Sequence, residues 1–188
     1  MLTMRDLGLT LDETSHAPIL LLQEEAGQEL LPIWIGPLEA MAISVVLGNM
    51  PRERPLTHDL FINMLHTLKA RLIGVELVAL REGAYYADLV VLLESGVTSR
   101  LDCRPSDAVA LALRAQAPIR ADRELLRRAA ALQRSAEESC GYTFAHVPVR
   151  KLVVQLHADM GAPPGQDAEQ DRFAELLRSL EPISKRKM

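Results

Sequence analysis

Cysteine, aromatic residues and long apolar runs are all scarce in this chain of 188 residues. The two cysteines, Cys103 and Cys140, form no metal-binding spacing, so we expect free thiols and a reducing, cytoplasmic location. Aromatic residues make up 4% of the chain, which means that aliphatic side chains must fill the core. No apolar run is long enough for a membrane span, and the first ten residues lack the apolar core of a signal peptide. We therefore expect no membrane partner.

The chain also lacks a positive net charge. Its formal net charge is −4, so it has no general attraction for nucleic acid, and a nucleic-acid partner would need a local basic patch or metal ions. Two such groups exist: Arg120, Arg123, Arg127, Arg128 and Arg134, and then Lys185, Arg186 and Lys187 at the end of the chain. A solvated helix face and an exposed tail are the simpler explanations of these two groups.

Hydrophobic periodicity predicts the secondary structure over most of the chain. Alternating or continuous apolar runs bounded by turn residues predict strands over 2–11, 17–25, 30–35, 71–81, 84–93 and 97–103. Helical spacing predicts helices over 37–47, from a Thr57 cap to about 68, after Pro105 until before Pro118, and a short one capped by Asp122. This order predicts a single-domain α+β fold with a largely antiparallel, mixed sheet and helices packed on one side.

The last third of the chain has a weaker pattern. We place the domain at residues 1–130 and a C-terminal extension at 131–188. The extension contains a strand-like segment over 147–156, a Gly- and Pro-rich linker at about 158–170, and a short amphipathic helix over 173–180.

The run from Asp102 to Ala112 carries the strongest functional signal. Pro105 cannot continue a central strand, and good helix formers follow it, so Asp102, Arg104 and Asp107 lie at a junction between a strand and a helix. A helix N-terminus attracts anions through its unpaired N–H groups and its dipole. Such a junction suits phosphate chemistry, but an Arg104–Asp107 ion pair that holds the turn is the simpler alternative.

Two further acids and one histidine belong to the same set of candidates. Glu39 and Asp59 fall in the first turns of predicted helices. The helix dipole favours an acid at such a position, so helix capping is a sufficient reason for Glu39 and Asp59, and also for Asp107. His58 is the best proton-transfer candidate, because imidazole titrates near neutral pH, although a histidine at a helix start is often incidental.

Phosphodiester hydrolysis needs charge neutralisation and an activated water, and carboxylates that hold Mg²⁺ or Mn²⁺ can supply both. We expect Asp102, Asp107 and Asp59 as metal ligands, Arg104 as a phosphate clamp, and Glu39 and His58 as further catalytic residues.

Three segments together resemble the bifunctional nuclease domain, formerly a domain of unknown function. They are Leu31–Ala40 (LPIWIGPLEA), Arg54–Asp59 (RPLTHD) and Asp102–Ala112 (DCRPSDAVALA), and 171–182 is similar to the terminal helix that often closes such chains. The resemblance covers about residues 1–130. Cys103 departs from it, because a small residue such as Ala is usual there.

The resemblance implies a nuclease that hydrolyses the phosphodiester bonds of DNA and RNA with low sequence specificity. The alternative is a non-catalytic binding or regulatory module that uses the same polar cluster to contact a partner or an anionic ligand. The apolar region from Leu31 to Leu38 and an aliphatic sheet edge predict self-association, with a homodimer as the simplest form.

Overall fold

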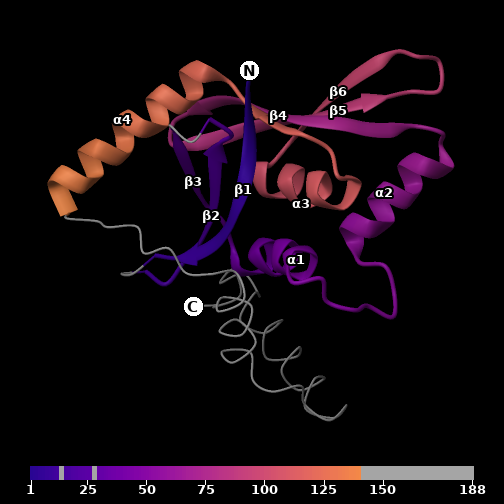
Figure 1. Ribbon diagram of the computed structural model, residues 1–188, viewed down its shortest axis with the longest axis horizontal. Coiled ribbons are helices and arrows are strands. Elements are labelled where there is room, and N and C mark those ends of the chain that lie inside the picture. The colour runs from indigo at the N-terminus through magenta and orange to yellow at the C-terminus, as the bar shows by residue number, and fades with distance from the viewer. Residues whose placement is uncertain (13–14, 27–28, 141–188) are drawn as a thin grey trace, which may run out of the picture. The chain divides into compact units, whose positions relative to one another are not determined.

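The computed structural model describes residues 1–12, 15–26 and 29–140. Seven strands and four helices lie in this part of the chain (Figure 1). The strands are β1 (Leu2–Leu11), β2 (Pro18–Glu24), β3 (Leu30–Trp34), β4 (Arg71–Arg81), β5 (Ala84–Leu92), β6 (Thr98–Cys103) and β7 (Ile119–Ala121). The helices are α1 (Pro37–Leu47), α2 (Thr57–Thr67), α3 (Pro105–Ala115) and α4 (Arg123–Cys140).

The strands form one mixed sheet in the order β3-β2-β1-β7-β4-β5-β6. Every neighbouring pair is antiparallel except β7 and β4, which are parallel. The predicted α+β class with a largely antiparallel sheet is therefore confirmed. The sequence pattern missed β7, which joins the two halves of the sheet, because its three residues are too few to show a period of two.

Aliphatic side chains fill the core, as the low aromatic content predicts. Val75 and Leu77 on β4 pair with Leu89 and Ala87 on β5, and these four buried side chains share the face that packs against α3. Helix α3 contributes an almost continuous buried run from Ala108 to Ala112. Small alanines allow α3 to lie close to the sheet and to its neighbours, and α1 and α2 both contact it (Figure 1).

Local residue chemistry sets the helix starts. Pro37 and Pro105 occupy the first positions of α1 and α3, where the missing N–H costs no hydrogen bond. Asp122 caps α4, as predicted, because its Oδ1 accepts the N–H of Glu124 at 2.8 Å. The predicted Thr57 cap of α2 is wrong by one residue: Leu56 is the cap, and Asp59 satisfies it by accepting the Leu56 N–H at 2.8 Å.

Helix α4 is longer than expected and has 18 residues. Arg123, Arg127 and Arg128 are exposed on it, and Arg128 pairs with Glu124 four residues earlier at 3.1 Å. No helix within the described part of the chain is long and apolar enough to cross a membrane. The strand, linker and terminal helix expected after residue 146 lie outside the described residues, and the domain boundary at 130 stays a prediction.

Candidate active site at the start of helix α3

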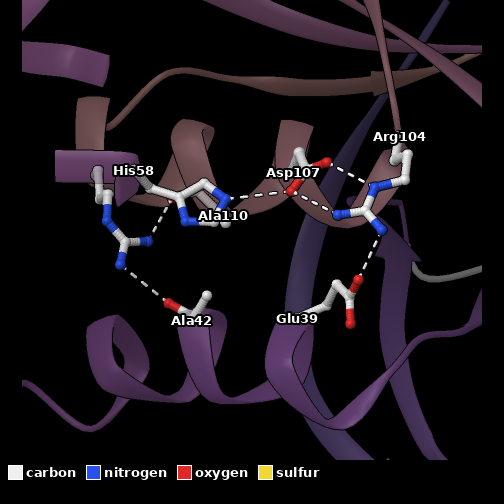
Figure 2. Close-up of polar contacts among 7 residues, drawn as sticks. Glu39, Ala42, His58, Arg104, Asp107 and Ala110 are labelled. Carbon is white, nitrogen blue, oxygen red and sulfur yellow. Dashed lines mark hydrogen bonds and ion pairs between the residues drawn. The ribbon is translucent and has the colours of Figure 1, made fainter. Parts of the chain in front are cut away.

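The guanidinium of Arg104 joins two carboxylates from different helices. Its Nε donates to Oδ2 of Asp107 at 2.8 Å and its Nη2 donates to Oδ1 of the same carboxylate at 3.3 Å. Its Nη1 donates to Oε1 of Glu39 at 2.7 Å (Figure 2). The Arg104–Asp107 ion pair, which we gave as the simpler explanation of this motif, is thus present. Arg104 also binds a third residue, Glu39 on α1.

His58 completes the cluster from helix α2. Its Nε2 lies 3.2 Å from Oδ1 of Asp107, and Figure 2 shows the imidazole and Arg104 reaching Asp107 from opposite sides. Its side chain is 19% exposed, that of Asp107 is 29% exposed and that of Arg104 is 65% exposed. The cluster of Glu39, His58, Arg104 and Asp107, which we call the α3 cluster, therefore opens to solvent through Arg104.

Electrostatics keep Asp107 and Arg104 charged at neutral pH. Burial raises the pKa of the Asp107 carboxyl, but the hydrogen bonds from Arg104 and His58 outweigh burial and leave this pKa below its ordinary value. The Asp107 and Glu39 carboxylates raise the pKa of Arg104. Asp107 is therefore a hydrogen-bond acceptor that stays ionised. Such a carboxylate can orient a histidine, but it is a poor proton donor.

Glu39 reaches Arg104 because it folds back over the residue that caps its own helix. Gly36 has φ −77° and ψ 164°, an extended conformation that any residue adopts. A Cβ at this position would overlap the carboxylate of Glu39. Glycine at position 36 leaves space for the position that the Glu39 carboxylate takes, and its backbone freedom is not used.

Asp59 does not join the α3 cluster, although it follows His58 directly. Its Oδ1 accepts the Nε of Arg114 at 2.7 Å, and its Oδ2 accepts the Leu56 N–H and lies 3.7 Å from the Nε of Arg52. Burial raises the pKa of Asp59, and these hydrogen bonds and the two arginines outweigh it, so the pKa is lowered. Both oxygens of this carboxylate are already held by the protein.

Asp102 lies on the other face of the sheet. It pairs with Asp88 on β5, while its neighbours Leu101 and Cys103 pair with Leu89 and Ala87, which face α3. Since side chains alternate along a strand, Asp102 points away from α3. The structure therefore separates Asp102 from Asp107, although both belong to one motif.

The expected Mg²⁺ or Mn²⁺ ligands Asp102, Asp107 and Asp59 do not meet in one place. Asp107 accepts from Arg104 through both oxygens, Asp59 is held as described, and Asp102 lies across the sheet. Divalent cations need several free oxygen ligands around one point. This donor set does not fit a cation shared by the three residues, and among the described residues no other group of three or more His, Cys, Asp or Glu side chains could hold one.

Arg114 is a residue that the sequence reasoning missed. Its side chain is 5% exposed, and it contacts three helices: Asp59 on α2, the Ala110 carbonyl on α3 at 2.8 Å, and the Ala42 carbonyl on α1 at 3.0 Å. The available signal was its spacing, because Asp107, Ala110 and Arg114 recur at intervals of three and four and so share one helix face.

The arrangement defines an α+β domain with an exposed arginine and a histidine–carboxylate pair at the N-terminus of a buried helix. Comparison with known proteins gives the family. The sequence model of the bifunctional nuclease domain family matches residues 20–134, which is more than half of the chain. The chain therefore belongs to this family. The resemblance stated from the sequence is confirmed.

Individual relatives are similar over the same region. An uncharacterized protein of Mycobacterium tuberculosis (strain CDC 1551 / Oshkosh) is 39% identical over 129 residues, which are 69% of this chain and 76% of that protein. Bifunctional nuclease 1 of Oryza sativa subsp. indica is 27% identical over 116 residues, covering 61% of this chain and 35% of the plant protein. Bifunctional nuclease 2 of Arabidopsis thaliana is 27% identical over 115 residues, covering 58% of this chain and 34% of that protein.

Proposed function

We propose that this chain is a nuclease that hydrolyses phosphodiester bonds of DNA and RNA with low sequence specificity. The observation that carries the proposal is the exposed Arg104 guanidinium beside the His58–Asp107 pair, at the N-terminus of α3. The family and the names of its plant members support the same chemistry.

In this proposal Arg104 binds the phosphate. A guanidinium has five N–H groups, and three of them donate to Asp107 and Glu39, so two remain for phosphate oxygens. The two carboxylates hold the guanidinium in place before substrate arrives, which lowers the entropy lost on binding. The N-terminal dipole of α3 adds attraction for the same negative charge.

His58 transfers the proton. With its Nε2–H donating to Asp107, the other ring nitrogen, Nδ1, has a lone pair and can accept a proton. A water attacks phosphorus as Nδ1 takes its proton, the phosphorus–oxygen bond to the leaving sugar breaks, and the leaving oxygen receives the proton from His58. No step uses a 2′-hydroxyl, so DNA and RNA are both suitable substrates.

Mg²⁺ or Mn²⁺ stays a predicted cofactor, and the reaction proposed for Arg104 and His58 does not pass through a metal ion. If Mg²⁺ or Mn²⁺ is required, Asp59, Asp102 and Asp107 cannot bind it together, so other groups must be among its ligands. The cytoplasmic location and the homodimer also stay predictions, and the exposed Trp34 and Leu38 are consistent with a contact there, at 47% and 58% exposure.

The decisive experiment compares Asp107→Asn and His58→Gln with Asp102→Asn. Labelled single-stranded DNA and RNA are incubated with each purified protein, with Mg²⁺, with Mn²⁺ and with chelator. We expect Asp107→Asn and His58→Gln to lose at least about 100-fold in kcat, in line with general acid–base contributions. Asp102→Asn is expected to keep its activity, because its side chain lies on the other face of the sheet.

Equal cleavage by wild type, Asp107→Asn and His58→Gln would mean that the activity comes from elsewhere and would overturn the proposal. Loss in Asp102→Asn together with a requirement for Mg²⁺ or Mn²⁺ would restore the metal site expected from the motif and overturn the mechanism described above.

A non-catalytic binding module is the second candidate, and one observation favours it. Glu39 and Asp107 are both paired with Arg104, so the α3 cluster is satisfied without a ligand. This reading predicts that wild-type protein binds a short oligonucleotide or another anion without cleaving any nucleic acid. Binding without cleavage under all three metal conditions would favour it over the nuclease.

A further inference from the structure

Arg114 links the three helices that carry the α3 cluster. Glu39 lies on α1, His58 on α2 and Asp107 on α3, and Arg114 donates one hydrogen bond to a group on each of these helices. Its side chain is 5% exposed, whereas that of Arg104 is 65% exposed. The two arginines of this region therefore have different surroundings, and Arg114 is too buried to meet a phosphate.

We propose that Arg114 is a positioning residue that holds His58 against Asp107, and the part of this inference that concerns activity rests on the proposed nuclease function. The path runs through Asp59, whose Oδ1 accepts the Arg114 Nε at 2.7 Å. The other oxygen of Asp59 accepts the Leu56 N–H at 2.8 Å and closes the first turn of α2. His58 lies in that turn, between Leu56 and Asp59.

The same guanidinium also fixes the helix that carries Glu39. The Ala42 carbonyl, which accepts from Nη2 at 3.0 Å, lies three residues after Glu39 on α1. Figure 2 labels Ala42 on α1 and Ala110 on α3, the two residues whose carbonyls accept from Arg114. The three acceptors are bound by three different nitrogens of the guanidinium, Nε, Nη1 and Nη2, whereas lysine has a single nitrogen, so lysine is not an equivalent residue here.

This arrangement gives Asp59 a role different from the one expected from the sequence. Asp59 does not touch the α3 cluster, and both of its oxygens have partners. It transmits the position of Arg114 to the turn that holds His58. A displacement of about 1 Å at a catalytic group can cost about 100-fold in rate, so a buried group that never meets substrate can still control turnover.

The test uses the full chain with Arg114→Lys, Asp59→Asn and a control, Arg128→Lys. Arg128 is an exposed arginine paired with Glu124 on α4, so its replacement applies the same chemical change away from the site. Asp59→Asn keeps an oxygen for the Leu56 N–H and removes the charge that Arg114 binds. Histidine is labelled with ¹⁵N in its ring, and the His58 signals are assigned by their loss in His58→Gln.

We expect Arg114→Lys and Asp59→Asn to shift the ring nitrogen signals of His58 and to lower kcat by about 10- to 100-fold, with KM changed less than threefold because Arg104 is unaltered. Arg128→Lys should match wild type in both measurements. A purely structural role for Arg114 would lower thermal stability without moving the His58 signals.

If Arg114→Lys folds cooperatively and leaves the His58 signals and kcat at wild-type values, the proposal is wrong. If that variant does not fold, Asp59→Asn decides by the same two measurements. Failure of the nuclease function itself would appear as an inactive wild type, and the His58 signals would still decide whether Arg114 positions this ring.

Discussion

Nε2 of His58 lies 3.2 Å from Oδ1 of Asp107, although 49 residues separate them in the sequence. Neither residue would be notable alone, because an acid is common in a first helical turn and a single histidine there is often incidental. Their contact turns two helix-start residues into a pair that can orient an imidazole. The chemistry of this protein therefore depends on how α2 and α3 pack against each other.

Replacement of Arg104 by lysine should weaken substrate binding more than turnover. Lysine keeps the positive charge but has one nitrogen in place of the three that bond Asp107 and Glu39, so it cannot hold both carboxylates in this geometry and present two further N–H groups to a phosphate. Hydrogen bonds to charged groups are worth about 1.5–3 kcal/mol, so we expect KM for a short oligonucleotide to rise roughly 10- to 100-fold. Steady-state kinetics measures this change, and Arg5→Lys, at an exposed arginine that bonds Gln23 on β2, is the control.

Gly36→Ala tests whether the position of Glu39 matters. The backbone at Gly36 accepts alanine, so the free energy of unfolding should change by no more than about 0.5 kcal/mol. The added methyl group overlaps Oε2 of Glu39, so the carboxylate must shift, and we expect this shift to disturb the bond from Oε1 to Arg104. We expect activity to fall as far as it falls in Glu39→Gln. Wild-type activity in Gly36→Ala, beside a clear loss in Glu39→Gln, would show that the carboxylate finds Arg104 from another position.

Stability should fall in acid because of Asp59 and Asp107. Both pKa values are lower in the folded protein than in an unfolded chain, where an aspartate titrates near pH 4. The stabilisation from these carboxylates is therefore fully present above about pH 4–5 and is lost as the pH falls through the folded pKa values. Chemical denaturation between pH 7 and pH 3 should show a shallower pH dependence for Asp59→Asn and Asp107→Asn than for wild type.

Asp59→Asn should also lower stability at neutral pH. It removes the charged partner of a guanidinium that is almost fully buried, and we expect a loss of about 1–3 kcal/mol. Asp102→Asn, at an exposed carboxylate, is the matched control and should change the free energy of unfolding by less than about 0.5 kcal/mol. Equal losses in the two variants would mean that the Arg114–Asp59 contact adds little to the fold.

The Cys103 thiol should react slowly at neutral pH. Burial, together with the carboxylates Asp107, Asp102 and Asp88, raises its pKa to about 11. The thiolate is the nucleophile, so alkylation of native protein should increase with pH toward a midpoint near this value. The rate is measured in a Cys140→Ser background, with denatured protein as the reference. A midpoint near pH 8.5, the ordinary value for cysteine, would contradict the burial described for this residue.

Much of the fold could be predicted from the sequence because its signals are local. Pro37 and Pro105 mark helix starts through their fixed φ and missing N–H, and Asp122 caps α4 by binding amides two and three residues ahead. Alternation along β5 separates Ala87 and Leu89 from Asp88 without reference to any other strand. By contrast, β7 is held by pairing with β1 and β4, and three residues contain no pattern that could have predicted it.

The sequence by itself determined the order of every described element except β7, the aliphatic core and the presence of Arg104, Asp107, His58 and Glu39 at helix starts, since these follow from interactions between residues close along the chain. Only the tertiary structure decided which of these side chains meet. Asp102 and Asp107 share one short motif, yet strand alternation directs Asp102 across the sheet, whereas helix packing brings His58 to Asp107. Spacing along a chain sets the direction of a side chain within its element, but the contacts between elements depend on how buried surfaces such as that of α3 fit together.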